Sequence, residues 1–175
     1  PDPRGVLPVG DFHASRSMRR SARGFSVSVD GAFDRVVAAC ADPNRSGAWI
    51  NRAYRRGYSD LHRLGWAHSV EVWQDDRLVG GVFGVGIGRW FAGESMFHLA
   101  TDASKVALWH LTGVLGPTTL MDVQWVTDHL ATLGAVSVDR RDYLMLAAEL
   151  QEAPAAPIPA SARQPAVQRL GSRIR

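Results

Sequence analysis

The sequence predicts an α+β protein in which helices flank a central, mostly antiparallel sheet. Three apolar or alternating stretches follow one another closely between residues 67 and 96, which is typical of an antiparallel meander. Helical patterns precede and follow this meander, so the order of elements is mixed. The chain has 175 residues, 46% of them apolar, which is enough for one domain with a substantial core.

Before the meander, the sequence predicts one strand and two helices. Residues 25–29 (FSVSV) alternate between apolar and polar, as a strand does. Asp30 is expected to cap the helix that follows. The apolar face of this helix consists of Phe33, Val36, Val37 and Cys40. This periodicity places the chain's single cysteine in the core. Residues 49–64 then form a second helix, which Gly65 ends.

The meander itself has strands at 67–73, 78–85 and 90–96. Asp75 and Asp76 form the turn between the first two.

After the meander, Asp102 and Ser104 open a helix that Gly116 and Pro117 stop. The remaining elements are a strand at 120–125, a short helix at 127–133, a last strand at 136–138 and a helix at 141–150. Beyond Glu152 the composition turns to Ala, Pro, Ser and Arg. We therefore expect a single domain over residues 1–152 and a disordered tail over residues 153–175.

The composition excludes several kinds of protein. No apolar run approaches the roughly 18 residues of a membrane helix, and no secretory signal is visible. One cysteine excludes a disulfide framework, and the six histidines lack the spacing of zinc ligands. We therefore expect no metal, no membrane partner and a cytoplasmic location. The chain also lacks a starting Met, which is typical of a fragment.

The arginines form two groups. The first comprises Arg16, Arg19, Arg20 and Arg23, and the second comprises Arg52, Arg55, Arg56 and Arg63. One interpretation is that both groups are solvated polar faces. The other is that they contact phosphates, because the guanidinium fork matches phosphate geometry. The small excess charge of +3 and the pI near 9.6 agree with an anionic partner.

The glycines between residues 80 and 88 resemble a nucleotide-binding loop, but their context does not. A phosphate loop follows a strand and opens a helix, whereas the residues after Gly88 continue as a strand. We expect these glycines to permit close backbone approach or a bulge instead.

Three polar side chains lie in strongly apolar surroundings. Glu94 lies within GESMF, where a carboxylate must be paired or used in function. Asp122 and Gln124 are two residues apart on the strand LMDVQW, so their side chains share one face. They are either a buried hydrogen-bonded pair or part of a functional site.

Several strings in one order make a more specific pattern. They are DPRG, FHASRSMRR, AWI, AHSVEVW, LVGG, FAGESMFH, DASKVAL, LMDVQW, HLATLGA and RRDYL. Over residues 2–150 this pattern closely resembles the bacterial leucyl/phenylalanyl-tRNA–protein transferase family. Family members usually carry a further N-terminal segment ahead of DPRG, and this chain begins without it.

The resemblance implies an activity and a fold. Members transfer Leu, Phe or less often Met from aminoacyl-tRNA to the α-amine of proteins that begin with Arg or Lys. The product is an N-degron that ClpS reads and ClpAP degrades. The implied fold is that of the GCN5-related N-acetyltransferases, with no cofactor.

The resemblance also implies site residues. Gln124 accepts a hydrogen bond from the attacking amine, Asp122 orients that arrangement, and Glu94 contacts an amino group of donor or acceptor. The donor's apolar side chain is surrounded by Phe91, Gly93, Met96, Leu108 and Leu111. Trp49 and Tyr58 hold the terminal adenosine of the tRNA, and the group at Arg16, Arg19, Arg20 and Arg23 contacts acceptor-stem phosphates.

Two other functions remain open at this point. An acyl-CoA-dependent N-acetyltransferase would share the fold, but it would need a pyrophosphate loop that opens a helix. A non-catalytic RNA-binding remnant would need the basic surface but not Asp122 with Gln124.

Overall fold

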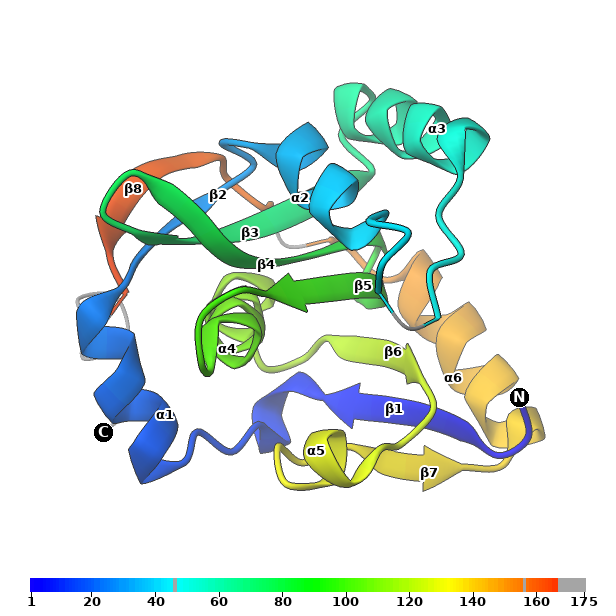
Figure 1. Ribbon diagram of the computed structural model, residues 1–175. Helices are drawn as coiled ribbons and strands as arrows, with labels where there is room; N and C mark the ends of the chain where they lie inside the picture. Colours follow the sequence, from blue (N-terminus) through cyan, green and yellow to red (C-terminus); the bar gives the residue numbers. More distant parts are fainter. Residues whose placement is uncertain (46, 156, 167–175) are drawn as a thin grey trace.

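The computed structural model describes residues 1–45, 47–155 and 157–166. Its centre is an eight-stranded sheet in the order β7-β1-β6-β5-β4-β3-β2-β8 (Figure 1). The strands are β1 (Arg4–Pro8), β2 (Ser26–Val29), β3 (Ala67–Gln74), β4 (Arg77–Ile87), β5 (Trp90–His98), β6 (Leu120–Gln124), β7 (Val136–Val138) and β8 (Ser161–Pro165). The helices are α1 (Arg16–Ser21), α2 (Phe33–Cys40), α3 (Arg52–Arg63), α4 (Ala103–Leu115), α5 (Asp128–Ala131) and α6 (Arg140–Glu152).

The predicted fold class is confirmed. Every neighbouring pair of strands is antiparallel except β5 and β6, which run parallel. The meander β3-β4-β5 lies at the middle of the sheet, and helices cover both of its faces (Figure 1). No described helix is long and apolar enough to span a membrane.

Strand β1 is an inner strand that the sequence pattern did not indicate. It pairs with β6 on one side and with β7 on the other, although both follow it by more than a hundred residues. Its RGVLP sequence does not alternate between apolar and polar residues. Long-range pairing in the sheet therefore makes it a strand.

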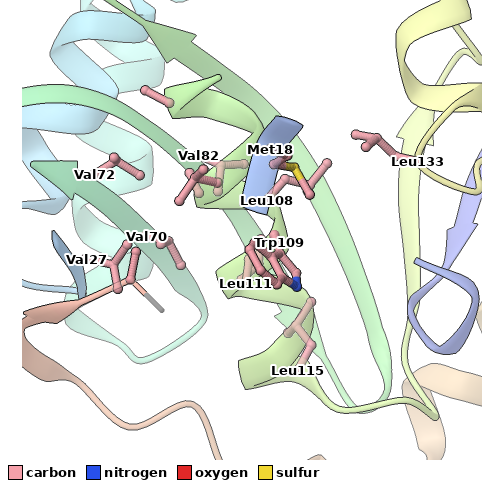
Figure 2. Packing of buried hydrophobic residues seen from close by; sticks show 14 of the residues in the cluster. Met18, Val27, Val70, Val72, Val82, Leu108, Trp109, Leu111, Leu115 and Leu133 are labelled. Carbon is pink, nitrogen blue, oxygen red and sulfur yellow. The ribbon is translucent and has the colours of Figure 1, made fainter. Parts of the chain in front are cut away.

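The two faces of the sheet bury separate cores. Helix α4 packs its apolar side chains onto one face, against valines of β2, β3 and β4 (Figure 2). The residues labelled there include Val27, Val70, Val82, Leu108 and Leu111. On the opposite face, the side chains predicted for the apolar face of α2 pack against Phe83 and Phe97. Cys40 is buried in this second core, as expected.

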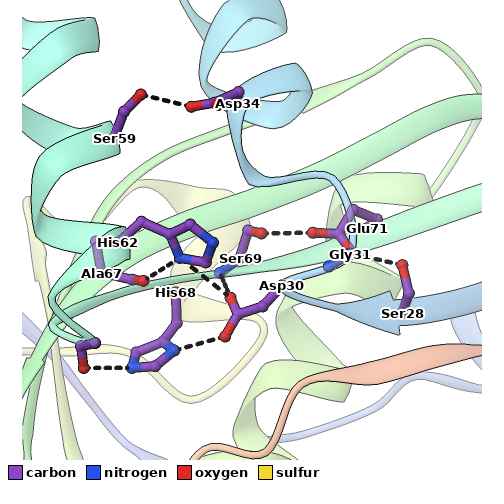
Figure 3. Close-up of polar contacts among 11 residues, drawn as sticks. Ser28, Asp30, Gly31, Asp34, Ser59, His62, Ala67, His68, Ser69 and Glu71 are labelled. Carbon is purple, nitrogen blue, oxygen red and sulfur yellow. Dashed lines mark hydrogen bonds and ion pairs between the residues drawn. The ribbon is translucent and has the colours of Figure 1, made fainter.

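A buried polar network joins β2, β3 and the start of α2 (Figure 3). Glu71 is fully buried and accepts hydrogen bonds from the hydroxyls of Ser28 and Ser69. Asp30 accepts from the Ser69 backbone N–H at 2.8 Å and pairs with His68 Nδ1 at 2.8 Å. The predicted helix cap at Asp30 is therefore wrong. Its backbone is left-handed (φ 58°), its carboxylate turns toward β3, and α2 begins at Phe33 without a side-chain cap.

Helix α3 is shorter than its sequence pattern suggested. It begins at Arg52, where the Asn51 side chain accepts hydrogen bonds from the N–H groups of Ala53 and Tyr54. Gly65 follows its end with φ +80°, as predicted for a C-terminal glycine. Trp49 lies in the loop ahead of the helix.

The glycine-rich stretch is a strand and not a phosphate loop. Strand β4 runs straight through Gly80, Gly81, Gly84 and Gly86. A Cβ on Gly84 would stand 2.1 Å from the carbonyl oxygen of Ala92, so only glycine allows this approach. The register shifts at this point, which leaves Glu94 of β5 without a partner on β4. The expected close approach and bulge both occur here.

The stretch after Glu152 is not wholly irregular, which corrects the expectation for its described part. Residues 161–165 form β8, an edge strand that pairs with β2. Arg163 fixes its position by stacking on Trp73 and by pairing with Asp76 at 3.0 Å. A polar composition does not reveal pairing of this kind, because the sheet edge supplies the backbone partners. Residues 156 and 167–175 of the expected tail lie outside the described part.

Candidate active site

The candidate site forms where β5 and β6 separate. The two strands pair only from Trp90 with Leu120 to Ala92 with Asp122. Beyond that point β5 continues beside β4, while the amide Nε2 of Gln124 donates to the Gly93 carbonyl at 3.0 Å. The side chain of Gln124 thus replaces the missing ladder contact at the fork.

Two hollows meet at this fork, and both are lined by Glu94 and Gln124. The apolar hollow, about 120 Å³, is completed by Val82, Gly93, Ser95, Met96, Leu108, Met121, Val123 and Leu130. The polar hollow, about 650 Å³, is completed by Arg4, Gly47, Trp49, Trp90, Ala92, Asp122, Trp125 and Tyr143. The first borders α4 and the second borders α6, and these helices lie on opposite faces of β5 and β6.

Asp122 is the centre of the polar hollow. Its side chain is 1% exposed and accepts two hydrogen bonds from the Arg4 guanidinium, at 2.9 and 2.7 Å. The Tyr143 hydroxyl donates to it at 2.7 Å, and the Gln124 backbone N–H donates at 2.9 Å. The carboxylate raises the pKa of Arg4, while burial and the bond to Asp122 raise the pKa of Tyr143. One buried carboxylate thereby ties together β1, β6 and α6.

Gln124 has an unusual backbone. Its φ is +62°, the left-handed region that costs a side-chain-bearing residue about 1–3 kcal/mol at a functional site. Two contacts maintain it: the Asp122 carboxylate bonds its N–H, and the Trp125 N–H donates to the Val123 carbonyl across it. On the neighbouring strand β1, a Cβ added to Gly5 would lie 2.6 Å from the carbonyl carbon of Trp125. Close packing therefore also fixes this end of β6.

Glu94 occupies the bulge in β5, where it lines both hollows. Bulges next to functional sites re-aim a side chain. Burial raises the pKa of the Glu94 carboxyl, the Tyr58 hydroxyl opposes this increase, and the nearby Asp122 charge adds to it. Because Arg4 balances Asp122, an ionised Glu94 would leave one net negative charge in the polar hollow.

An aromatic cluster lies at the rim of the polar hollow. The ring of Trp49, 44% exposed, meets the rings of Tyr54 and Tyr58 edge-on, with centroids 5.4 and 6.3 Å apart. Tyr58 is half-buried and packs edge-on against Phe83. The two residues expected to hold the adenosine are therefore neighbours, with Trp49 open to solvent.

The residues expected around the donor's side chain fall into two sets. Gly93, Met96 and Leu108 line the apolar hollow. Phe91 and Leu111 are buried in the core that α4 shares with the sheet and line neither hollow of the site.

The first arginine group lies apart from both hollows. Arg16, Arg19 and Arg20 belong to α1, which packs against α4, and Arg23 follows them. All four are exposed. The guanidinium of Arg19 stacks over the Trp109 ring at 5.0 Å, so this side chain also has a packing role.

Sequence reasoning missed the partners of Asp122. Arg4 and Tyr143 lie in DPRG and RRDYL, strings that carried the resemblance but received no role. The available signal was physical: a carboxylate on an inner strand requires cationic or hydroxyl partners. Among the described residues, no group of three or more His, Cys, Asp or Glu side chains could hold a metal ion.

An apolar hollow and a carboxylate-and-amide hollow thus meet at the fork between β5 and β6 of an α+β sheet. Residues 6–148 match the family described as leucyl/phenylalanyl-tRNA protein transferase. The chain belongs to this family.

Curated sequence relatives agree with this assignment. The chain is 52% identical over 149 residues to the leucyl/phenylalanyl-tRNA–protein transferase of Rhodopseudomonas palustris strain BisB18, covering 82% of this chain and 65% of that protein. It is 50% identical to that of Phenylobacterium zucineum, covering 82% and 67%. The chain thus spans about two thirds of the length of these curated relatives. Among solved structures, L-PGS from Bacillus licheniformis is similar at a TM-score of 0.44 and 11% identity, over 69% of this chain and 45% of that one.

Proposed function

We propose that this protein transfers Leu, Phe or, less often, Met from aminoacyl-tRNA to the N-terminal amine of proteins that begin with Arg or Lys. The observation that carries the proposal is the fork at Glu94 and Gln124, where an apolar hollow meets a polar one in a chain of this family. An apolar cavity of roughly 150 Å³ is enough to hold benzene. The apolar hollow, about 120 Å³, is somewhat smaller but of the same order, which suits one isobutyl or phenyl group and nothing larger.

The reaction needs positioning and one proton transfer. The amine nitrogen attacks the ester carbonyl, the amide bond forms, the ester C–O bond breaks, and the ribose hydroxyl takes up a proton. An α-amine has a pKa of about 7.7–8, so near neutral pH a substantial part of it is already the free nucleophile. Holding amine and ester in attack geometry supplies the remaining acceleration.

The proposed roles follow from the polar contacts. The Nε2 of Gln124 is bonded to Gly93, so its amide oxygen accepts the hydrogen bond of the attacking amine. Asp122 acts as a positioning residue, because its carboxylate holds the Gln124 backbone in place and is itself fixed by Arg4 and Tyr143. Glu94 supplies the negative charge that attracts the acceptor's ammonium or guanidinium group.

The product would be an N-degron for ClpS and ClpAP, and a cytoplasmic location would follow from the supply of charged tRNA. The exposed arginines Arg16, Arg19, Arg20 and Arg23 would contact acceptor-stem phosphates, as Arg–phosphate pairs do.

A transfer assay tests the proposal. Labelled Phe-tRNA is incubated with matched peptides that begin with Arg or Ala, using this chain and the same chain extended to the length of its relatives. Transfer to the Arg peptide alone supports the proposal. No transfer by either protein contradicts it, and acetyl transfer from acetyl-CoA would favour the acyl-CoA alternative.

A further inference from the structure

The second arginine group is the strongest feature that the site leaves unexplained. Arg52, Arg55 and Arg56 lie on α3 at spacings of three and four residues, so they share one face of the helix with Ser59. That face lines a groove of about 670 Å³ between α2 and α3, whose other lining residues are Asp34, Val37, Ala41, Pro43, Ile50 and Asn51. Helix α3 stands at the outer surface of the molecule (Figure 1).

The charge on this face is not neutralised within the protein. All three arginines are exposed, and none forms an ion pair with any residue that the structure describes. The single carboxylate in the groove, that of Asp34, accepts a hydrogen bond from the Ser59 hydroxyl (Figure 3). Like charges three and four residues apart destabilise a helix. These three arginines therefore do not stabilise α3, and their positive charge suits an anionic partner.

The groove is continuous with the candidate site along the chain. Trp49 lines the polar hollow, and the next three residues, 50–52, line the groove. The exposed rings of Trp49 and Tyr54 lie at this junction with centroids 5.4 Å apart. Arginines beside exposed aromatic rings are the usual surface for single-stranded nucleic acid, because the arginines contact phosphates and the rings stack on bases. An acidic peptide would use the charge but not the rings.

We propose that the groove binds the sugar–phosphate backbone of the single-stranded 3′ end of the donor tRNA, with Arg52, Arg55 and Arg56 on successive phosphates. This inference rests on the proposed function, which places an aminoacyl ester in the adjacent polar hollow. The α1 arginines lie on the opposite side of the molecule from α3 (Figure 1) and line neither hollow of the site, so the two basic surfaces contact different parts of one tRNA.

Donors with and without phosphates test the inference. One donor is the phenylalanyl ester of adenosine, which has no phosphate, and the other is the phenylalanyl ester of the trinucleotide CCA with a 5′-phosphate, which has three. The variant is Arg55→Gln/Arg56→Gln, and the matched control is Arg140→Gln/Arg141→Gln, an adjacent exposed pair on α6. We measure kcat/KM for transfer to an Arg peptide.

The expected result is that the parent and the control prefer the trinucleotide donor over the adenosine donor. In the α3 variant that preference falls about tenfold for each lost phosphate contact, since a charge-assisted hydrogen bond contributes on this scale. An unchanged preference overturns the inference. A raised KM for the acceptor peptide, with the donor preference intact, also overturns it and points to a protein partner.

A binding measurement separates this inference from the proposed function. If neither the chain nor its extended version transfers from these donors or from Phe-tRNA, transfer fails as the function, and the groove is then tested by the anisotropy of a labelled single-stranded RNA ending in CCA. Binding whose salt slope falls by about 0.7 for each lost contact in the α3 variant supports the groove. Equal slopes for variant and control overturn it.

Discussion

At the residue scale, Gln124 combines backbone strain with a proposed chemical role. Its left-handed backbone is held by Asp122 and by the packing of Gly5 against Trp125. Strain of this kind persists where the surroundings over-determine it, which is common at functional sites. A change to glycine, which relieves the strain, should therefore affect stability and transfer differently.

We predict that Gln124→Gly abolishes most transfer while the protein becomes as stable as the parent or more so. Glycine adopts positive φ without a steric cost, which offsets the loss of the bond to Gly93. Thermal unfolding and the transfer assay are measured together, with Gln124→Ala as the comparison. Gln124→Ala should be less stable than Gln124→Gly, and equal stabilities would contradict the strain argument.

Glu94 makes a prediction about stability and pH. Burial raises the pKa of its carboxyl in the folded protein above the value of about 4.3 in an unfolded chain. The contribution of Glu94 to the free energy of unfolding is therefore fully present at pH values below the unfolded pKa. It is lost as the pH rises through the folded pKa. At pH 7 the stabilisation that the protonated carboxyl contributes at acid pH is therefore reduced or lost.

Glu94→Gln should consequently raise Tm at pH 7 and leave it nearly unchanged at pH 4. For a chain of this size, about 1 kcal/mol corresponds to roughly 2–4 °C. Calorimetry at both pH values measures the difference, and a variant less stable than the parent at pH 7 would show that the charge is well compensated.

Met96 makes a prediction about donor size. It is half-buried and lines the apolar hollow of about 120 Å³. Met96→Phe adds volume there, so it should lower kcat/KM more for Phe-tRNA than for Leu-tRNA, by about tenfold for each 1.4 kcal/mol of lost contact. Parallel transfer assays give the ratio. The same ratio in variant and parent would mean that the donor's side chain binds elsewhere.

At the element scale, the bulge between β4 and β5 is the device that places Glu94. The bulge exists because Gly84 lets the backbone of Ala92 approach. The alternation of apolar residues predicts neither the register shift nor the position that it gives to Glu94.

Gly84→Ala should therefore lower both stability and transfer. The new Cβ would stand 2.1 Å from the Ala92 oxygen and 2.4 Å from Phe91, and overpacking of this kind costs about 1–3 kcal/mol. Gly57→Ala is the control, because Gly57 faces open space inside α3 and the change should stabilise the helix by about 0.5–1 kcal/mol. Thermal unfolding of the two variants should shift in opposite directions.

The elements that the sequence predicted are those whose local pattern is strong. The meander, α2 and α4 combine a clear periodicity with turn or stop residues such as Gly116. Strands β1 and β8 have no such pattern and form because a distant sheet edge offers partners. The site follows the same division: Asp122 and Glu94 stood out as carboxylates in apolar surroundings, whereas Arg4 and Tyr143 join them only through β1 and α6.

At the scale of the whole molecule, two basic surfaces flank the sheet from different sides. Phosphate contacts from the exposed arginines of the α1 region would not distinguish bases, since such contacts position a nucleic acid without reading its sequence. Affinity for tRNA should therefore depend on salt and hardly on tRNA identity.

Arg16→Gln/Arg20→Gln/Arg23→Gln should flatten the salt dependence of tRNA binding by about 0.9 log units per lost duplex contact. Arg19 is kept, because its stacking on Trp109 makes it part of the packing as well. Fluorescence titrations at several salt concentrations measure the slope. A slope equal to that of the parent would identify these arginines as a solvated face.

The inner position of β1 determines when the candidate site can fold during translation. Arg4 and Asp122 are 118 positions apart, and β1 has no neighbour in the sheet until β6 and β7 have been made. At about 5–20 residues per second, a ribosome needs roughly 6–24 s to synthesise the chain between the two. During that interval the nascent β1 has unpaired backbone groups and an uncompensated guanidinium. Asp122, Gln124 and the fork between β5 and β6 can therefore assemble only late in synthesis, after the meander has had time to form.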